Sequence, residues 1–221
     1  MKVSIMQPYF FPYPGYYRLM VEADFFVVLD DVQFPRRGWV HRNKFSIGNN
    51  SDWFTLPVKK QPRESLILDT VFREDSHISI EKNLNRFDCF RFASSEILNL
   101  IKFKPQYIID YLMKQLAWVH HVMGFNSNIL KSSELEVNPL LKGQDKIIEI
   151  SNILYATEYI NLSGGKDLYC RKDFERRGLN LKFLRPYQGS KLSTLESILL
   201  YGLKKTKEMI VNEFTSDQIT G

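Results

Sequence analysis

The stretch MKVSIMQPYFFPYPGYYRLMVEADFFVVLDD (residues 1–31) contains two short apolar runs on either side of a segment of helical composition. Val3–Met6 is typical of a short buried strand, and Phe25–Leu29 is a continuous apolar run, as is typical of a strand that is covered on both faces. Residues 16–23 supply the helix between them. A strand, a helix and a second strand in about thirty residues make a βαβ unit, which predicts a parallel sheet.

Beyond this unit the chain changes character twice. Strand-like runs at 53–58 and 66–71, with turn signals between them, predict a small antiparallel β excursion within residues 45–75. Helical periodicity then predicts an insertion over about 76–128. The last third returns to α/β alternation, with strands predicted at 129–131, 158–162 and 179–184 and helices at 143–154, 195–201 and 206–214. We therefore predict one α/β domain over 1–221, with three layers and a largely parallel, Rossmann-like sheet.

The composition narrows the classes of function. The 221 residues carry 30 basic and 25 acidic side chains, which gives a net charge of +5. A moderate basic excess suits anionic partners such as nucleotides, phosphosugars or RNA, although an ordinary solvated surface has the same composition. Basic residues form no block of five or more, so a dedicated nucleic-acid-binding module is not the first choice.

The signals for compartment and cofactors are few. Cys89 and Cys170 are isolated, as is usual in a reducing compartment. The N-terminal apolar run is too short for a signal peptide, and no run reaches the roughly 18 apolar residues of a membrane span. We therefore expect a cytoplasmic protein without membrane insertion. Because CxxC, HExxH, P-loop and GxGxxG motifs are all missing from the sequence, we expect neither a metal nor a bound cofactor.

In open α/β sheets ligands bind beyond the carboxyl ends of the strands, and the first such segment is unusual. Gln7–Tyr16 places three prolines and five aromatic residues among ten. Prolines stiffen a loop, and aromatic rings on it stack on a base or a sugar; a hydrophobic plug beneath the sheet is the alternative. A polar residue that leaves a buried strand favours a ligand. The candidate binding residues here are Gln7, Tyr9, Tyr13, Gly15 and Tyr16.

The second segment, residues 30–44, combines carboxylates with cations. Two carboxylates at a strand end can act as a base, bind a metal or, more commonly, pair with nearby arginines. Arginine binds a diphosphate or a carboxylate bidentately. We take Asp30, Asp31 and His41 as candidate catalytic residues. The candidate binding residues of this segment are Gln33, Arg37, Trp39, Arg42, Asn43 and Lys44.

Two further strand ends carry small polar residues. Ser132 and Ser133 are candidates for a phosphate contact, although a helix cap uses the same residue types. Ser163 and Gly164 would let the backbone approach a ligand closely, with a plain turn as the alternative. Tyr169 closes that segment and joins the candidate binding residues.

Together these segments resemble the WbqC-like protein family over essentially the whole chain. The resemblance is carried by Met6–Tyr16 and Asp30–Asn43, and more weakly by Ser132-Ser133 and Ser163–Tyr169. At His41 the chain departs from the family pattern, in which Asn is expected before the Arg-Asn pair.

The resemblance implies an enzyme of bacterial surface polysaccharide (O-antigen, lipopolysaccharide) biosynthesis. It implies an N-acyl or aminoacyl transferase that acts on a nucleotide-linked amino sugar, with an acyl or aminoacyl donor that includes tRNA. Two alternatives stay open. One is an ATP-dependent adenylyl-transferring enzyme or ligase, and the other is a non-catalytic protein that binds nucleotide sugars or tRNA.

A second resemblance concerns the fold. Tyr13–Tyr16 stands at a strand-to-helix junction, where nucleotidylyl transferases have a His-x-Gly-His turn, which implies a nucleotidylyl-transferase-like form of the sheet. Tyrosines replace both histidines, and tyrosine supplies no cation to a reacting phosphate at neutral pH. We therefore expect the fold to be shared without the adenylylation chemistry.

Overall fold

The computed structural model describes residues 1–211. They form a five-stranded parallel sheet in the order β5–β2–β1–β6–β7, which confirms the predicted α/β fold. The two apolar runs of the opening unit pair in register, from Val3 beside Phe25 to Met6 beside Val28. The strands are β1 (Lys2–Met6), β2 (Phe25–Val28), β5 (Asn128–Lys131), β6 (Glu158–Leu162) and β7 (Asn180–Leu184).

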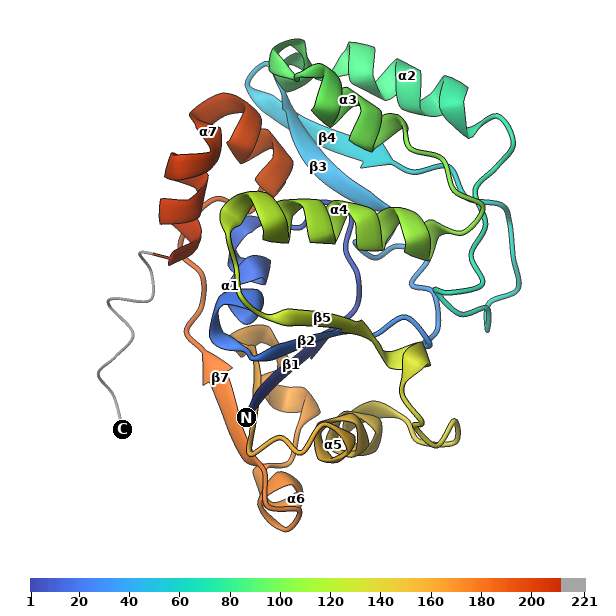
Figure 1. The fold of residues 1–221 in the computed structure, drawn as a ribbon. Coiled ribbons are helices and arrows are strands. Elements are labelled where there is room, and N and C mark those ends of the chain that lie inside the picture. Colours follow the sequence, from blue (N-terminus) through green and yellow to red (C-terminus); the bar gives the residue numbers. More distant parts are fainter. Residues whose placement is uncertain (212–221) are drawn as a thin grey trace.

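Helices cover both faces of this sheet (Figure 1). One face carries α1 (Pro14–Glu22), α4 (Ile108–Met123) and α7 (Thr194–Val211); the other carries α5 (Gly143–Ile153) and α6 (Arg171–Glu175). Strand side chains alternate between the two cores. Phe26 and Val28 join the cluster that contains the α1 and α4 side chains, whereas Val3, Ile5 and Val27 join the cluster of α5. Burial on both faces explains why β1 and β2 are almost uninterrupted apolar runs.

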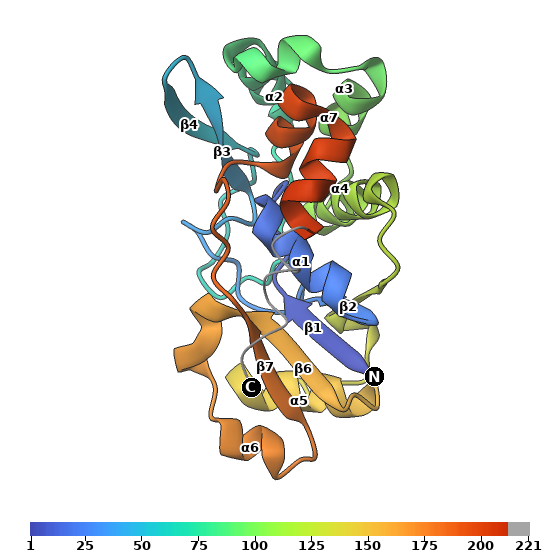
Figure 2. The same ribbon diagram turned by 90° about the vertical axis from the view of Figure 1, so that its left-hand side faces the viewer.

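A subsidiary layer lies beyond α4, on the face opposite α5 and α6 (Figure 2). Its elements are β3 (Arg42–Ile47), β4 (Asn50–Thr55), α2 (Ser76–Arg86), the 3₁₀ helix η1 (Asp88–Phe92) and α3 (Ser95–Lys102). Four phenylalanines hold it together, with ring centroids 5.2 to 6.4 Å apart: Phe45, Phe54, Phe87 and Phe90. The predicted antiparallel excursion therefore exists as the β3–β4 hairpin.

The predicted strand at 66–71 is wrong. The backbone of this segment makes only isolated β-bridges, because its N–H groups donate to carbonyls of the loop after β2. The N–H groups of Ile67 and Leu68 donate to the carbonyls of Val32 and Asp30, each over 3.0 Å. The segment thus lies along residues 30–34 and helps to build the surface beside the carboxyl end of β2.

Two helical predictions change in detail. α4 falls inside the predicted insertion, yet it covers the sheet in the connection from β2 to β5. α7 contains both predicted closing helices and bends between them at Gly202, where φ is 78°. Residues 212–214 of the second predicted helix lie outside the described residues. Within residues 1–211, no helix combines the length and hydropathy that a membrane span requires.

Candidate functional site

A cavity of about 600 Å³ opens beyond the carboxyl ends of β1 and β6. From β1 the chain builds the sheet outward through β2 and β5, then returns to the other side of β1 for β6 and β7. The strand order therefore reverses between β1 and β6, and open α/β sheets bind their ligands at such a switch point. The walls come from the loop after β1, from residues 161–169 and from residues 185–191.

The loop after β1 is held rigidly from behind. The Asn43 side-chain amide donates to the carbonyls of Phe10 (3.0 Å) and Phe11 (2.5 Å). Gln115 of α4 donates to the carbonyl of Tyr9 (2.6 Å) and accepts from the Phe11 N–H (2.7 Å). The Ser193 hydroxyl also donates to the Phe11 carbonyl, over 2.9 Å. These bonds hold Phe11 at a φ of 38°, a conformation that L-residues rarely adopt.

The residues of this loop fall into two groups, one buried and one facing the cavity. Phe10 and Phe11 are fully buried and form the hydrophobic plug. Gln7, Tyr9 and Tyr13 line the cavity instead. Among the described residues, no hydrogen-bond partner is found for the Gln7 side-chain amide, so it is available to a ligand.

Two cations give the cavity its charge. Arg185 and Lys191 contribute to the lining, and no carboxylate of the described chain does. The Lys191 ammonium donates to the Tyr187 carbonyl (3.1 Å) and lies 4.9 Å from the ring centroid of Tyr13 and 5.4 Å from that of Tyr187. Cation–π contacts hold an ammonium in place without neutralising it. The cavity therefore suits an anionic ligand with a flat ring or sugar.

The β6 side of the cavity is a small hydrogen-bond network. The amide of Asn161 donates to the hydroxyls of Tyr159 (3.0 Å) and Tyr169 (3.1 Å), and its oxygen accepts from the Leu162 N–H (2.7 Å). Burial raises the pKa of Tyr159 well above its usual value, so this hydroxyl stays protonated. The network fixes the Tyr169 hydroxyl at the wall, beside Ser163 and Gly164.

Sequence reasoning missed four lining residues with polar side chains: Asn161, Arg185, Tyr187 and Lys191. Asn161 carried a signal, because it interrupts the apolar run of a buried strand. The residues after β7 satisfied the same strand-end rule as the predicted segments. Lys191 lies seven positions beyond β7, and only the folded chain returns it to the cavity.

The predicted acid and serine residues form a separate cluster at the ends of β2 and β5. The Asp30 carboxylate accepts from the Ser133 N–H (3.0 Å) and hydroxyl (2.7 Å), and the Ser132 hydroxyl lies 3.0 Å away. The Asp31 carboxylate lies 2.6 Å from the Lys146 ammonium and 2.5 Å from the Ser132 hydroxyl. The partner of Asp31 is thus a lysine of α5, not one of the nearby arginines. The cluster adjoins the cavity and fastens β2 to β5.

The predicted residues of segment 33–44 are dispersed. Trp39 reaches the cavity, and its ring lies 5.1 Å from that of Trp53. Arg42 stacks 4.1 Å over Trp53 and donates to the carbonyls of Arg37 and Gly38, while Lys44 lies 5.3 Å from the same indole. Gln33 and Arg37 line a different cleft. Of the candidate residues in this segment, Trp39 therefore lines the cavity and Asn43 holds the β1 loop from behind.

His41 lies away from the cavity, packed 5.0 Å from the ring of Phe34. Its side chain is buried, and its Nδ1 has no hydrogen-bond partner among the described residues. Burial, assisted by the charge of Arg42, lowers its pKa from 6.5 to about 4. The imidazole is therefore neutral at pH 7, and its surroundings favour a structural role.

Replacing His41 with Phe is expected to flatten the acid side of the stability curve. Between pH 6.5 and about 4 the unfolded chain binds a proton that folded His41 does not accept, so stability falls as the pH falls through this window. The full loss below the folded pKa is roughly 3 kcal/mol. Urea unfolding at several pH values measures it, and identical pH slopes for both proteins would contradict the assignment.

Gly15 and Tyr16 support the cavity from α1 and do not line it. The Tyr16 hydroxyl donates to the Gln7 carbonyl over 2.9 Å, and its ring is fully buried. A Cβ on Gly15 would lie 2.6 Å from the Tyr187 ring and closer still to that of Tyr13. Because Gly15 has no side chain, the rings of Tyr13 and Tyr187 can pack directly against the backbone of α1.

Alanine at Gly15 is expected to destabilise the protein by about 1–3 kcal/mol through overpacking. A loss of stability would be the opposite of the usual effect, because replacing Gly with Ala in a helix interior usually stabilises a protein by about 1 kcal/mol. Gly164→Ala is the control: its Cβ meets nothing within 4 Å, and we expect a change under about 0.5 kcal/mol. Thermal unfolding compares the two variants, and a more stable Gly15→Ala protein would refute the packing described here.

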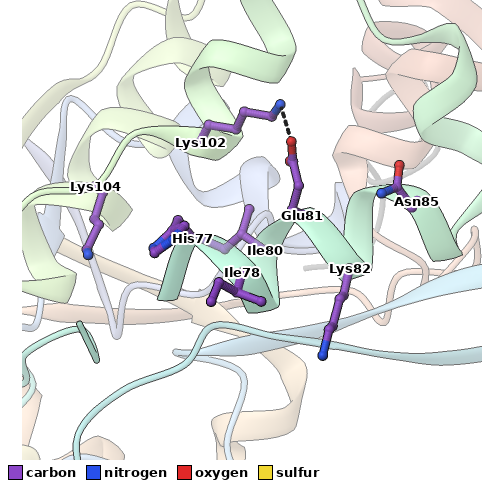
Figure 3. A pocket seen from close by; sticks show the side chains of 8 residues that line it. All are labelled: His77, Ile78, Ile80, Glu81, Lys82, Asn85, Lys102 and Lys104. Carbon is purple, nitrogen blue, oxygen red and sulfur yellow. Dashed lines mark hydrogen bonds and ion pairs between the residues drawn. The ribbon is translucent and has the colours of Figure 1, made fainter. Parts of the chain in front are cut away.

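A second hollow, of about 440 Å³, lies between α2 and α3 (Figure 3). Glu81 and Lys102 point toward one another across it and form an ion pair of 2.9 Å. None of the predicted site residues lines this hollow, and it is remote from the strand ends. Within residues 1–211, no three His, Cys, Asp or Glu side chains are grouped closely enough to hold a metal ion.

Comparison with known proteins identifies the family of the chain and a curated relative. Residues 7–193 match the model of the WbqC-like protein family, from the first residue of the cavity loop to the serine that holds Phe11. The chain is 36% identical over 168 residues to Uncharacterized protein Rv1507c of Mycobacterium tuberculosis, covering 72% of this chain and 71% of that protein. No solved structure matches the chain.

Proposed function

Because the chain belongs to the WbqC-like protein family, we propose that it is a transferase of bacterial surface polysaccharide biosynthesis. The proposed reaction carries an acyl or aminoacyl group to the amine of a nucleotide-linked amino sugar. The observation that carries this proposal is the cavity between the ends of β1 and β6. Its lining combines tyrosine rings with two cations and, among the described residues, no carboxylate.

The cavity has the size and chemistry of a nucleotide-sugar site. A volume of about 600 Å³ lies within the usual range of small-molecule sites, about 300–1,000 Å³. Lys191 provides positive charge for a diphosphate. Tyr9, Tyr13 and the half-exposed Trp39 provide rings on which a base or a sugar stacks.

The lining suits aminolysis of an activated acyl group. The amine nitrogen attacks the donor carbonyl carbon, the new C–N bond forms, and the bond to the donor's sulfur or ribose oxygen breaks. The amine proton passes to the leaving group or to water. This reaction depends mainly on orientation and on donors toward the developing oxyanion. The Gln7 amide and the Tyr169 hydroxyl are the donors we assign to it.

Asp30 and Asp31 are assigned to positioning in this proposal. Each carboxylate already accepts several hydrogen bonds or an ion pair, so service as a base would require it to leave these partners. An amine nucleophile needs only a weak base. The cluster instead holds the ends of β2 and β5, and thereby the wall that Leu29 and Ile147 contribute to the cavity.

The test is a coupled binding and product assay. We expect a UDP- or dTDP-linked amino sugar to bind, the corresponding free amino sugar to bind much more weakly, and an N-acylated product to appear by mass spectrometry with a thioester or aminoacyl-tRNA donor. Pyrophosphate release from ATP in the presence of a carboxylic acid would support the adenylyl-transfer alternative instead. Nucleotide-sugar binding without any product would support a binding protein.

A further inference from the structure

A cationic cleft lies beside the loop Gln33–Trp39, which also sends Trp39 into the cavity. The cleft has a volume of about 540 Å³, and its cations are Arg36, Arg37 and Arg63. An adjoining cleft of about 390 Å³ shares Arg36 and adds Lys59 and Lys60. Five cations thus border one continuous surface.

The charge of this surface is concentrated. No carboxylate of the described residues lines either cleft. Within residues 1–211, Lys59 is the only one of the five cations with a carboxylate partner, Glu74 at 3.3 Å, and that glutamate side chain is 93% exposed.

The backbone beneath the arginines is fixed. The Gln33 side chain donates to the Arg63 carbonyl (2.6 Å), and the Phe34 N–H donates to the Ser65 carbonyl (2.8 Å). The Arg36 guanidinium donates to the Gln61 carbonyl over 3.2 Å. These bonds tie the loop after β2 to residues 61–65. The cations therefore project from a braced frame, which lowers the entropy cost of binding a ligand.

We propose that this surface binds the phosphate groups of the acyl donor. Arg37 lines the cleft and Trp39 lines the cavity, and their Cα atoms are at most about 7 Å apart, so a donor whose phosphates bind at Arg37 lies beside the cavity. This inference rests on the proposed transferase function. The shared chemistry is a ligand with several phosphates and a reactive ester, and its two sources are a coenzyme A thioester and an aminoacyl-tRNA.

The probes are coenzyme A, by calorimetry, and a short labelled single-stranded RNA, by fluorescence anisotropy, both at low salt. The test variant combines Arg36→Gln, Arg37→Gln and Arg63→Gln. The control combines Arg171→Gln, Lys172→Gln and Arg177→Gln, three exposed cations at α6 on the other face of the sheet. Both variants lose three charges, so they differ only in where the charges are lost.

We expect wild-type protein to bind at least one probe and the cleft variant to bind it about 10- to 100-fold more weakly. The control should stay within about threefold. For RNA, the slope of log K against log salt should fall in magnitude by about 2 in the cleft variant. Binding of coenzyme A indicates the thioester as the source, and binding of RNA alone indicates the tRNA. Binding of neither probe, or equal weakening in both variants, would overturn the proposal.

Binding of the nucleotide sugar is measured as well, because it tests the proposed function independently of this inference. The cleft variant should bind the UDP- or dTDP-linked amino sugar as wild type does. If wild-type protein binds the nucleotide sugar but neither phosphate probe, the donor surface is wrong and the acceptor cavity stands. If it binds a probe through the cleft but no nucleotide sugar, the proposed function fails while the phosphate surface stands.

Discussion

Replacing Asp30 with alanine is expected to lower the free energy of unfolding by about 2–4 kcal/mol. The carboxylate is 1% exposed and receives the Ser133 N–H and hydroxyl as well as the Ser132 hydroxyl. Alanine would leave these donors without an acceptor and open a void between the ends of β2 and β5. Urea denaturation measures the loss, and an unchanged m-value would show that the unfolded state is not altered.

Asp30→Asn is the matched control. The amide keeps an oxygen for the Ser133 N–H and the same shape, so about 1 kcal/mol should be lost. A positioning role also predicts that Asp30→Asn still turns over substrate, whereas a catalytic base would lose nearly all activity. An Asp30→Ala protein as stable as wild type would show that the cluster does not fasten the two strands.

Replacing Lys191 with Met is expected to weaken binding of a nucleotide-linked sugar by about 10- to 100-fold. Methionine keeps the apolar stem beside Tyr13 and Tyr187 and removes only the ammonium. The loss should appear with the nucleotide sugar and not with the free amino sugar, because only the former carries the diphosphate. Isothermal titration calorimetry measures both.

Lys104→Met controls for the general loss of one positive charge. Lys104 borders the hollow between α2 and α3 (Figure 3), away from the strand ends. The affinity of the Lys104→Met protein for the nucleotide sugar should stay within about twofold of the wild-type affinity. Equal weakening in the two variants would mean that net charge, and not a local contact of Lys191, determines the affinity.

Much of the fold follows from residues 1–31, because continuous apolar strands and a short helix between them leave few alternatives to a parallel sheet. The strand at 66–71 could not be rejected from its composition. Its backbone donors go to the carbonyls of Val32 and Asp30, and such long-range pairing leaves no local pattern.

The sequence indicates which strand ends carry polar residues, but not the structural role of each side chain. The strand-end rule selects the loop at Gln7, the acids at Asp30 and the serines at Ser132, and these segments do follow β1, β2 and β5. It does not say which polar groups are already used inside the protein. Asn43 holds the loop from behind and Lys146 pairs with Asp31, and both facts depend on side chains that meet only in the folded chain.

A crystal structure of the protein with a UDP- or dTDP-linked amino sugar tests the assigned site most directly. We predict density for the nucleotide sugar between the carboxyl ends of β1 and β6, with its diphosphate beside Lys191 and its amine facing the Gln7 and Tyr169 side chains. A ligand bound at the Asp30–Ser133 cluster, at the hollow between α2 and α3 or in the arginine cleft, with this cavity unfilled, would contradict that assignment.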